Sequence, residues 1–523
     1  MDPKETIIQK LIKSKTKTPP ALAKLKRQIA KEFKIPCFSN IELLRVYHKL
    51  VVNKRIKSSK IIENLLRTRP VRSLSGIVNI SVLTKPYPCP GKCIFCPTQK
   101  DVPKSYLDNE PAVMRAILNK FDPAKQVQMR IRSLKMTGHP TDKIELRIIG
   151  GTWSFYPKTY QTWFIKKCFD ACNKKGSKTL ARAQEKNEKA KHRIIGLSIE
   201  TRPDFVDKKE IKRMRKLGIT GVELGVQSIY DDILKLNKRG HKIKATIEAT
   251  KFLKDSGFKV CYQMMPNLPG SNLKKDGKMF EELFRSPDFR PDFLKIYPCA
   301  ILKTAPLYKW HKQGRYKPYT EKQLKNLLKI IKKEIPYYVR VQRIIRDIPA
   351  QSIVAGAVKI SNLRQVLARE MEKENWQCKC IRCREIKGNF KPKEKIYLFR
   401  KDYEASRGKE IFLSFENKSR TKLYSLLRLR VPYSKNFMPA LKETAIIREV
   451  HTYGQQLPIG QDNNPAVSAQ HKGLGKKLMK EVEKITKKEF KLNKIAVISG
   501  VGTRNYYKKL GYKLKDTYMI KDI

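Results

Sequence analysis

The chain has 523 residues, 40% of them hydrophobic, which is enough for at least two domains with apolar cores of their own. It has no apolar run of about 18 residues and no apolar signal segment in its first stretch, MDPKETIIQKLIKSK, so we expect a cytoplasmic protein with reduced thiols and no membrane partner. Its 114 basic and 48 acidic residues give a net charge of +66, which favours a phosphate-rich partner such as RNA, although a solvated lysine-rich surface would give the same total.

The first segment, residues 1–75, holds 19 basic and five acidic residues and is predicted to form short helices interrupted at Pro19-Pro20. It has few aromatic residues, so we expect it to contact RNA phosphates rather than to read bases. A second basic stretch, YKWHKQGRYKPY at residues 308–319, alternates cations with aromatic rings. Such a mixture suits folded or single-stranded RNA, because the rings stack on bases beside the phosphate contacts.

Residues 76–350 change to a pattern of short apolar runs, each followed by turn residues and then by an amphipathic stretch such as 207–217 or 245–256. This alternation predicts an α/β fold in which six parallel β/α units form a closed or partly closed barrel. The side chains that follow the strands should lie together at one end of the barrel. The predicted strands are 77–83, 144–149, 193–199, 221–226, 259–265 and 293–297.

Three cysteines follow the first predicted strand in the order Cys89-x3-Cys93-x2-Cys96. A four-iron cluster is normally held by four thiolates, so three on one loop would leave one iron open to a small molecule. The alternatives are a buried structural cluster and a zinc site, but zinc requires a fourth ligand and usually two Cys-x2-Cys pairs. The position directly after a barrel strand favours the iron–sulfur interpretation.

A second group of cysteines, Cys378, Cys380 and Cys383, lies in a connector over residues 351–394. We predict a structural zinc site there with Cys299 as the fourth ligand; the alternative is a reduced surface cluster. The remaining cysteines are interpreted as small core residues, and three histidines as surface groups. The cysteines are Cys37, Cys168, Cys172 and Cys261, and the histidines are His139, His241 and His311.

The last segment, residues 395–523, is predicted to be a separate α+β domain with strands near 396–400, 411–415, 423–429 and 444–450. Its long helix is predicted over about 473–490 and begins within the stretch Gln470-His471-Lys472-Gly473-Leu474-Gly475-Lys476. Glycines at a helix start let backbone N–H groups point at a pyrophosphate. Tyr506 and Tyr507 follow the next strand, either as a general acid or as two core tyrosines on a short helix.

The cysteine spacing resembles the radical S-adenosylmethionine (SAM) superfamily, and the glycine-rich turn resembles the acetyl-CoA loop of GNAT-type acetyltransferases. The first resemblance implies a [4Fe-4S] cluster and SAM, with Gly150 and Gly151 close to the SAM amino group and with Glu200 and Arg202 on its ribose and carboxylate. The combination resembles the family of Elongator catalytic subunits, which modify the wobble uridine of tRNA. The matching stretches are 105–115, 199–204, 264–269, 346–349 and 498–507.

This family resemblance implies that acetyl-CoA, SAM and the anticodon region of a tRNA meet in one enzyme. A 5′-deoxyadenosyl radical would take hydrogen from the acetyl methyl, the carbon radical would add to C5 of uridine 34, and hydrolysis would leave 5-carboxymethyluridine. Lys295 and Tyr297 would line the radical pocket, and Tyr506 or Tyr507 would protonate the CoA thiolate. The implied acetyl-CoA contacts are Lys143, Glu449, Val450, His451, Thr452, Gly473, Leu474, Gly475, Lys476 and Tyr507.

One departure separates this chain from eukaryotic members, which carry a long insertion between the first two cluster cysteines, whereas the compact spacing here is of archaeal type. Two other functions stay open: a protein lysine acetyltransferase with a structural cluster, and a non-enzymatic tRNA-binding scaffold. The net charge of +66 disfavours a basic protein substrate, which it would repel. The sequence leaves open which tRNAs are modified, the electron donor, and the oligomeric state, including a homodimer.

Overall fold

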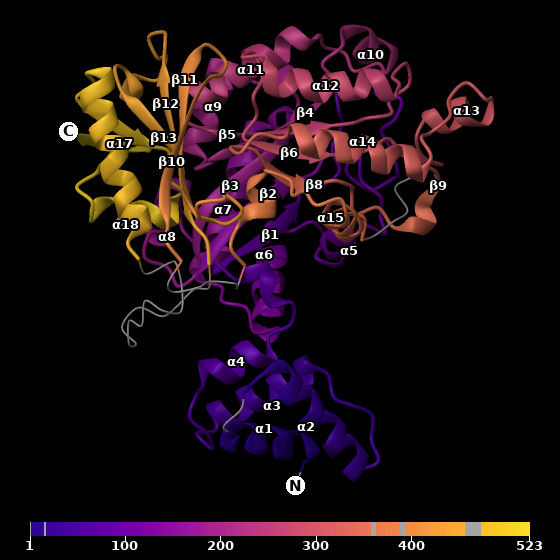
Figure 1. Cartoon of the computed structure of the whole chain (residues 1–523), viewed down its shortest axis with the longest axis vertical. Coiled ribbons are helices and arrows are strands. Elements are labelled where there is room, and N and C mark those ends of the chain that lie inside the picture. The colour runs from indigo at the N-terminus through magenta and orange to yellow at the C-terminus, as the bar shows by residue number, and fades with distance from the viewer. Residues whose placement is uncertain (1, 15–16, 357–361, 388–393, 455–471) are drawn as a thin grey trace.

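The computed structural model describes all residues except 1, 15–16, 357–361, 388–393 and 455–471. Figure 1 shows three parts: a small helical domain at the N-terminus, a central barrel, and a mixed domain at the C-terminus that packs against the barrel's flank. None of the described helices is both long and apolar enough to cross a membrane.

The N-terminal domain consists of four helices around a small core of its own. That core contains Ile7, Leu11, Leu43 and Tyr47, all almost fully buried. Pro19 begins a helix instead of interrupting one, since proline is well tolerated at a first helical position. A narrow neck joins this domain to the barrel (Figure 1). The helices are α1 (Pro3–Lys13), α2 (Pro19–Glu32), α3 (Asn40–Val52) and α4 (Lys60–Leu66).

The barrel is an open sheet of seven parallel strands in the order β1-β2-β3-β4-β5-β6-β8. The six predicted strands are confirmed, and β8, which the sequence did not predict, is a short polar strand that extends the sheet. Because β1 and β8 are its two edges, the barrel has an open side. The strands are β1 (Ile77–Leu83), β2 (Lys143–Ile149), β3 (Arg193–Thr201), β4 (Gly221–Gln227), β5 (Lys259–Met264), β6 (Phe293–Ile296) and β8 (Arg340–Arg343).

Helices follow the strands of this sheet, and most of them cover its outer face and form the largest apolar core with it. They are α5 (Pro111–Leu118), α6 (Pro123–Met136), α7 (Lys158–Asn173), α8 (Leu180–Asn187), α9 (Lys208–Lys216), α10 (Asp231–Leu236), α11 (Ile243–Asp255), α12 (Leu273–Arg285), α13 (Leu307–Lys312), α14 (Glu321–Glu334), α15 (Leu363–Lys373) and α16 (Ile381–Arg384). A separate two-stranded sheet pairs β7 (Ile301–Leu302) with β9 (Ile353–Ala355).

The C-terminal domain is a second seven-stranded sheet, in the order β10-β11-β12-β13-β14-β16-β15, in which only β13 and β14 run parallel. This confirms the predicted α+β domain. Its elements are β10 (Tyr397–Glu404), β11 (Gly408–Glu416), β12 (Leu423–Pro432), β13 (Ala445–Thr452), α17 (Leu474–Phe490), β14 (Lys494–Val497), α18 (Arg504–Lys508), β15 (Lys513–Lys515) and β16 (Tyr518–Asp522).

Buried ion pairs join the C-terminal domain to the barrel. The Arg448 guanidinium on β13 donates to Asp292, just before β6, at 2.7 Å and to Glu410 on β11 at 2.7 Å. Lys254 lies 3.8 Å from both carboxylates, and burial lowers its pKa to about 8. Removing one member of such a group would leave a buried charge uncompensated, so the two domains are held in a fixed arrangement.

Two sequence interpretations of single residues are wrong. Cys37, predicted to lie in a core, is exposed, because it falls in the loop between α2 and α3. His139, predicted at the surface, is buried, with its Nδ1 2.7 Å from the Ser73 hydroxyl at the neck. Cys168, Cys172 and Cys261 are buried as predicted, whereas His241 and His311 are half-buried.

Candidate active site

The barrel encloses a cavity of about 1050 Å³ that extends from the C-terminal ends of its strands to their N-terminal ends. Strands of a covered parallel sheet normally read as continuous apolar runs. Here alternate positions are polar or small and face the cavity, which is a period-two signal that the sequence interpretation missed. These residues are Asn79 and Ser81, Glu145 and Arg147, Ser198 and Glu200, Gly221 and Glu223, Lys259, Cys261 and Gln263, Lys295, and Arg340 and Gln342.

The three cysteines of the first motif line this cavity at the C-terminal ends of the strands. Their Sγ atoms are not all within 4.8 Å of one another, in contrast to Cys378, Cys380 and Cys383. A four-iron cluster fits such spacing better than one zinc ion, since each thiolate then binds a different iron. Burial and the neighbouring Cys93 raise the pKa of the Cys96 thiol to about 12.

Two arginines face the cysteine loop. Arg239, which the sequence interpretation missed, donates from its Nη1 to the Cys93 Sγ at 3.5 Å. Arg202 donates to both carboxylate oxygens of Asp204, at 3.0 and 2.8 Å, while its Nη1 is buried without a hydrogen-bond partner. A Cβ added at Gly91 in the loop would lie 2.4 Å from that Nη1. The unpaired donor therefore points at the cysteine loop, where the carboxylate of a small molecule on the cluster would accept from it.

Gly150 and Gly151 lie at the end of β2, and both have positive φ. At Gly150 an added Cβ would lie 2.3 Å from the Thr84 hydroxyl, so only glycine fits. Gly151 lines the cavity beside Thr152, whose hydroxyl is 3.7 Å from the Cys89 Sγ. The predicted glycine pair is therefore next to the cysteine loop, and its contact with SAM stays a prediction.

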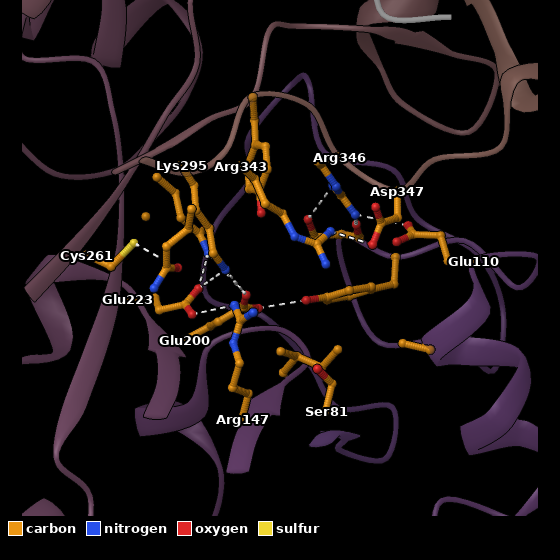
Figure 2. A pocket seen from close by; sticks show the side chains of 18 of the residues that line it. Ser81, Glu110, Arg147, Glu200, Glu223, Cys261, Lys295, Arg343, Arg346 and Asp347 are labelled. Carbon is orange, nitrogen blue, oxygen red and sulfur yellow. Dashed lines mark hydrogen bonds and ion pairs between the residues drawn. The ribbon is translucent and has the colours of Figure 1, made fainter. Parts of the chain in front are cut away.

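A group of paired charges occupies the middle of the cavity (Figure 2). Glu223 forms ion pairs with Arg147 and Lys295, and Lys295 is also 3.6 Å from Glu200. Burial acts to raise the pKa of Glu223, but Arg147 and Lys295 outweigh it and hold this pKa at about 2. Burial acts to lower the pKa of Lys295, yet the carboxylates, Glu223 foremost, raise it. Lys295 therefore stays cationic in the barrel, and its place in a radical pocket stays a prediction.

The carboxylate of Glu200 is already bound by neighbouring side chains. It accepts from the Tyr106 hydroxyl at 2.7 Å and from the Gln263 amide at 3.1 Å (Figure 2). Tyr106 and Gln263 are thus further site residues that the sequence interpretation missed. Tyr297 lines the same cavity, with the Lys295 ammonium 6.0 Å from the centre of its ring, and its place in a radical pocket stays a prediction. A ribose contact for Glu200 stays a prediction.

A second, smaller cavity of about 250 Å³ lies where β13 and β14 separate. Their parallel pairing ends at Ile447 and Val497, so among the described residues no strand pairs with the following part of β13 on that side. Glu449, Val450 and His451 line the opening, and Tyr507 closes it from the other side. An unpaired strand edge of this kind offers backbone groups to an extended ligand such as the arm of CoA.

Ionisation in this second cavity follows from burial. Burial lowers the pKa of His451 to about 4, so the imidazole is neutral at pH 7. It also raises the pKa of Tyr507, which keeps the phenol protonated. Burial acts to raise the pKa of Glu449 as well, but Arg428, which donates to it at 2.8 Å, brings it below its usual value.

The glycine-rich turn begins α17 close to this cavity. Gly473 has a φ of +67° at the helix start, and a Cβ added at Gly475 would lie 3.5 Å from the Tyr506 hydroxyl and 3.6 Å from that of Thr452. The structure thus brings together the turn, Tyr506 and the end of β13. Gln470 and His471 of the predicted motif lie outside the described residues. Lys143, at the start of β2, lines neither cavity, and its acetyl-CoA contact stays a prediction.

The two cavities share part of their walls. The common residues come mainly from the first positions of the barrel strands, at the end opposite the cysteine loop. The lumen of the barrel and the second cavity therefore adjoin at this end. The shared residues are Asn79, Glu145, Lys259, Phe293, Arg340, Gln342 and Arg382.

The second cysteine group forms a compact thiol cluster. The Sγ atoms of Cys378, Cys380 and Cys383 lie within 4.8 Å of one another, and the Lys332 ammonium is 3.6 Å from the Cys383 Sγ. The prediction that Cys299 is a fourth ligand is wrong. Cys299 is buried in a different apolar cluster with Ile94 and Leu307, because the chain after β6 turns toward the cysteine loop of the barrel.

Comparisons with known proteins agree with this geometry. A model of the radical SAM superfamily matches residues 87–283, and one of the radical SAM C-terminal domain matches residues 291–373. The open barrel with its cysteine loop is thus that of a radical SAM protein. A tRNA uridine(34) acetyltransferase of Methanocaldococcus infernus is 50% identical over 479 residues, covering 89% of each chain. Elongator complex protein 3 of Homo sapiens is 39% identical over 479 residues, covering 88% of this chain and 87% of its own.

A solved structure extends the similarity to three dimensions. The archaeal Methanocaldococcus infernus Elp3 with an N-terminal deletion of residues 1–46 has a TM-score of 0.75 and 46% identity, covering 86% of this chain and 99% of its own. The chain belongs to the family of tRNA uridine(34) acetyltransferases and Elongator complex protein 3.

Proposed function

We propose that this chain is a tRNA-modifying enzyme that uses SAM radical chemistry and acetyl-CoA to form 5-carboxymethyluridine at the wobble position of tRNA, U34. Relatives named tRNA uridine(34) acetyltransferase support the substrate and the acyl donor. The matched radical SAM models support the cluster and SAM. The observation that carries the proposal is the shared wall of the two cavities, because an acetyl group held in the second cavity would lie beside the lumen that contains the cysteine loop.

In the barrel, Cys89, Cys93 and Cys96 would hold a four-iron cluster, and the unpaired Arg202 Nη1 would bind the carboxylate of SAM. A bound and reduced cluster would supply radical chemistry there by way of SAM, and the residues around the lumen would hold the acetyl methyl from which hydrogen is taken. The ion pairs among Glu223, Arg147 and Lys295 would hold these side chains in place around the reacting carbon. Fixed polar groups need no rearrangement as the reaction proceeds.

In the C-terminal domain, the Gly473–Lys476 turn would hold the CoA pyrophosphate and the free edge of β13 the pantetheine arm. The thioester would then point toward the shared wall. When the thioester is cleaved, Tyr507 would give its proton to the CoA thiolate. Its raised pKa suits that role, because a proton donor must be protonated before the step.

The N-terminal domain would bind tRNA through its excess of lysine and arginine. Connector cysteines 378, 380 and 383 would hold a structural zinc ion, since three thiols within 4.8 Å suit one tetrahedral ion. Among the described residues, no His, Asp, Glu or further Cys joins them within that distance, so the fourth ligand would be a group of another kind or a solvent molecule.

The proposal is tested with acetyl-CoA that carries deuterium on its methyl carbon. Anaerobically reconstituted enzyme, SAM, a reductant and tRNA should give deuterated 5′-deoxyadenosine and a product uridine that keeps two deuterium atoms. A reaction without tRNA is the control. Unlabelled 5′-deoxyadenosine together with an intact acetyl group on lysine would establish a protein acetyltransferase instead.

A further inference from the structure

Two of the stretches that carry the family resemblance, residues 105–115 and 346–349, contact each other across the open side of the barrel. The first stretch follows the cysteine loop after β1, and the second follows β8, so the two extend from opposite edges of the sheet. The Arg346 guanidinium joins them, because it donates to the Ser105 carbonyl at 2.7 Å and to the Glu110 carboxylate at 3.0 Å (Figure 2). The open side is therefore bridged at the end that holds the cysteine loop.

Ser105 is held in an unusual backbone conformation at this bridge. Its φ of +81° lies in the left-handed region, which is uncommon for a residue other than glycine. Such a conformation persists only where the surroundings fix it, and Arg346 binds both the Ser105 carbonyl and, at 3.3 Å, its hydroxyl. Further along the segment, the Asn109 amide donates to the Ser352 hydroxyl across the same gap at 2.8 Å. Contacts from the β8 side therefore hold the backbone before and after Tyr106.

Tyr106 lies between this bridge and the lumen. The centre of its ring is 5.4 Å from the Arg346 guanidinium carbon, and its hydroxyl donates to the Glu200 carboxylate at 2.7 Å. Burial, and then the charge of Glu200, raise the pKa of Tyr106 well above its usual value, so the phenol keeps the proton that it donates. Arg346 is thereby linked to Glu200 through one intervening side chain.

The contacts of Glu200 leave one of its oxygens partly free. The Gln263 amide donates to Oε1 at 3.1 Å, and the Lys295 ammonium lies 3.6 Å from the same oxygen. In the described part of the chain, Tyr106 is the one hydrogen-bond donor to Oε2. A carboxylate oxygen has about two lone-pair sites, so Oε2 can accept from a ligand hydroxyl as well. Such a ligand would meet a carboxylate whose orientation is already set, and groups held in place in advance lose little freedom on binding.

We propose that Arg346 and Tyr106 are positioning residues for the radical step: Arg346 fixes the segment that carries Tyr106, and Tyr106 orients the Glu200 carboxylate toward a ribose hydroxyl of SAM. These roles rest on the proposed function, in which Glu200 would bind SAM. Hydrogen abstraction requires the donor and acceptor carbons at close distance, and a small misplacement of reacting atoms costs much of the rate. Arg346 touches neither reacting atom and acts through Tyr106 and Glu200.

The first test measures SAM binding to the reconstituted but unreduced enzyme by calorimetry. Tyr106→Phe should weaken SAM binding about tenfold, because it removes a hydrogen bond to the charged group that orients the ligand. In a Glu200→Gln background the same change should weaken binding about twofold or less, since Tyr106 acts through Glu200. Losses that multiply across the two sites, or wild-type SAM binding by Tyr106→Phe, would overturn the role of Tyr106.

The second test measures amide hydrogen exchange over residues 97–110 of the reconstituted full-length enzyme. Arg346→Gln should speed exchange there, because the contacts that hold this segment from the β8 side are lost. Arg343→Gln is the matched control, since Arg343 lies on the same side but pairs with Asp347 instead of this segment. It should leave exchange over 97–110 unchanged, and equal exchange in the two variants would overturn the bridge.

Arg346→Lys keeps the experiment decisive if Arg346→Gln does not fold. Lysine retains the charge but cannot present the two-pronged donor that reaches the Ser105 carbonyl and the Glu110 carboxylate together. It should give intermediate exchange over 97–110 and restore part of the SAM affinity lost in Arg346→Gln or, if that variant is unfolded, fall between wild type and Tyr106→Phe. Thermal unfolding identifies the folded variants. Wild-type exchange in folded Arg346→Lys would contradict the need for the guanidinium.

The third test separates positioning from a simple loss of folded enzyme. With methyl-deuterated acetyl-CoA and tRNA, the fraction of 5′-deoxyadenosine that carries deuterium does not depend on how much of the enzyme is active. Arg346→Gln and Tyr106→Phe should lower this fraction, because a misplaced radical is quenched by other hydrogen donors. A merely structural defect would lower the total product and leave the fraction unchanged, and that result would overturn the positioning roles.

Failure of these roles and failure of the proposed function give different results. If only the roles are wrong, wild-type enzyme transfers deuterium and the variants match it in labelled fraction, SAM binding and exchange over 97–110. If the function is wrong, wild-type enzyme transfers no deuterium. The SAM titrations and the hydrogen exchange then still decide whether Arg346 and Tyr106 hold Glu200 in place.

Discussion

The barrel cavity and the C-terminal cavity adjoin one another but hold their ligands by different means. The barrel cavity presents charged side chains in pairs, such as Lys295 and Glu223, and a loop of thiols. The C-terminal cavity presents a free strand edge, a neutral His451 and a protonated Tyr507. The first suits an ionic cofactor on a metal cluster, and the second suits a long, mostly uncharged thioester arm. Neither cavity alone suits both kinds of ligand, so we interpret the two cavities as two ends of one site.

The largest expected effect comes from the cysteine loop. Replacing Cys89, Cys93 and Cys96 by serine should abolish iron binding and SAM cleavage and leave acetyl-CoA binding unchanged, because the thiols line only the barrel cavity. Iron analysis, 5′-deoxyadenosine assay and calorimetry with acetyl-CoA measure the three properties. The matched control is serine at Cys378, Cys380 and Cys383, which should keep iron and SAM cleavage while thermal stability falls. Unchanged SAM cleavage in the first variant would refute the assignment.

A smaller effect is expected from Lys295→Met, which leaves Glu223 with Arg147 as its one cationic partner and Glu200 without its ammonium. When a buried carboxylate loses one of its cationic partners, the free energy of unfolding falls by about 3 kcal/mol. Deuterium transfer should fall much more than acetyl-CoA affinity. Denaturant titration measures the stability, and adding Glu223→Gln should restore part of it. Full stability in the single variant would show that the pair is not coupled as described.

Much of the fold followed from the sequence, whereas the walls of the site did not. The strands were predictable because each is rich in apolar residues with glycine or polar residues behind it, although the alternate polar positions that face the cavity were not recognised. The cysteine loop was predictable because ligand spacing is local. Arg239 and Tyr106 were not, since each contacts a residue far from it in sequence, Arg239 the Cys93 thiol and Tyr106 the Glu200 carboxylate. Cys299 was assigned to the wrong cysteines for the same reason: local spacing carries no information on which way the chain turns after β6.

The smallest effect concerns pH and the second cavity. The folded-state pKa of His451 is lowered to about 4, below an unfolded value near 6.5. The unfolded chain therefore binds the proton first as pH falls, so the contribution of the neutral imidazole is complete above about pH 6.5 and is lost as pH falls toward 4. The difference in unfolding free energy between wild type and His451→Gln should change by about 2 kcal/mol between pH 7 and pH 5. A difference that stays constant over this range would contradict the burial of a neutral His451.

The most direct test of the account concerns the wall that the two cavities share. Asn79 lies on the edge strand β1, is exposed, and lines both cavities, so Asn79→Trp should obstruct the passage, whereas Asn79→Ala should leave it open. The measurement is deuterium transfer from methyl-labelled acetyl-CoA to 5′-deoxyadenosine, beside separate titrations of SAM and acetyl-CoA. The account predicts that Asn79→Trp binds both cofactors and cleaves SAM but loses the label transfer, and that Asn79→Ala retains it. Label transfer at the wild-type rate in a folded Asn79→Trp enzyme would contradict a route through the barrel.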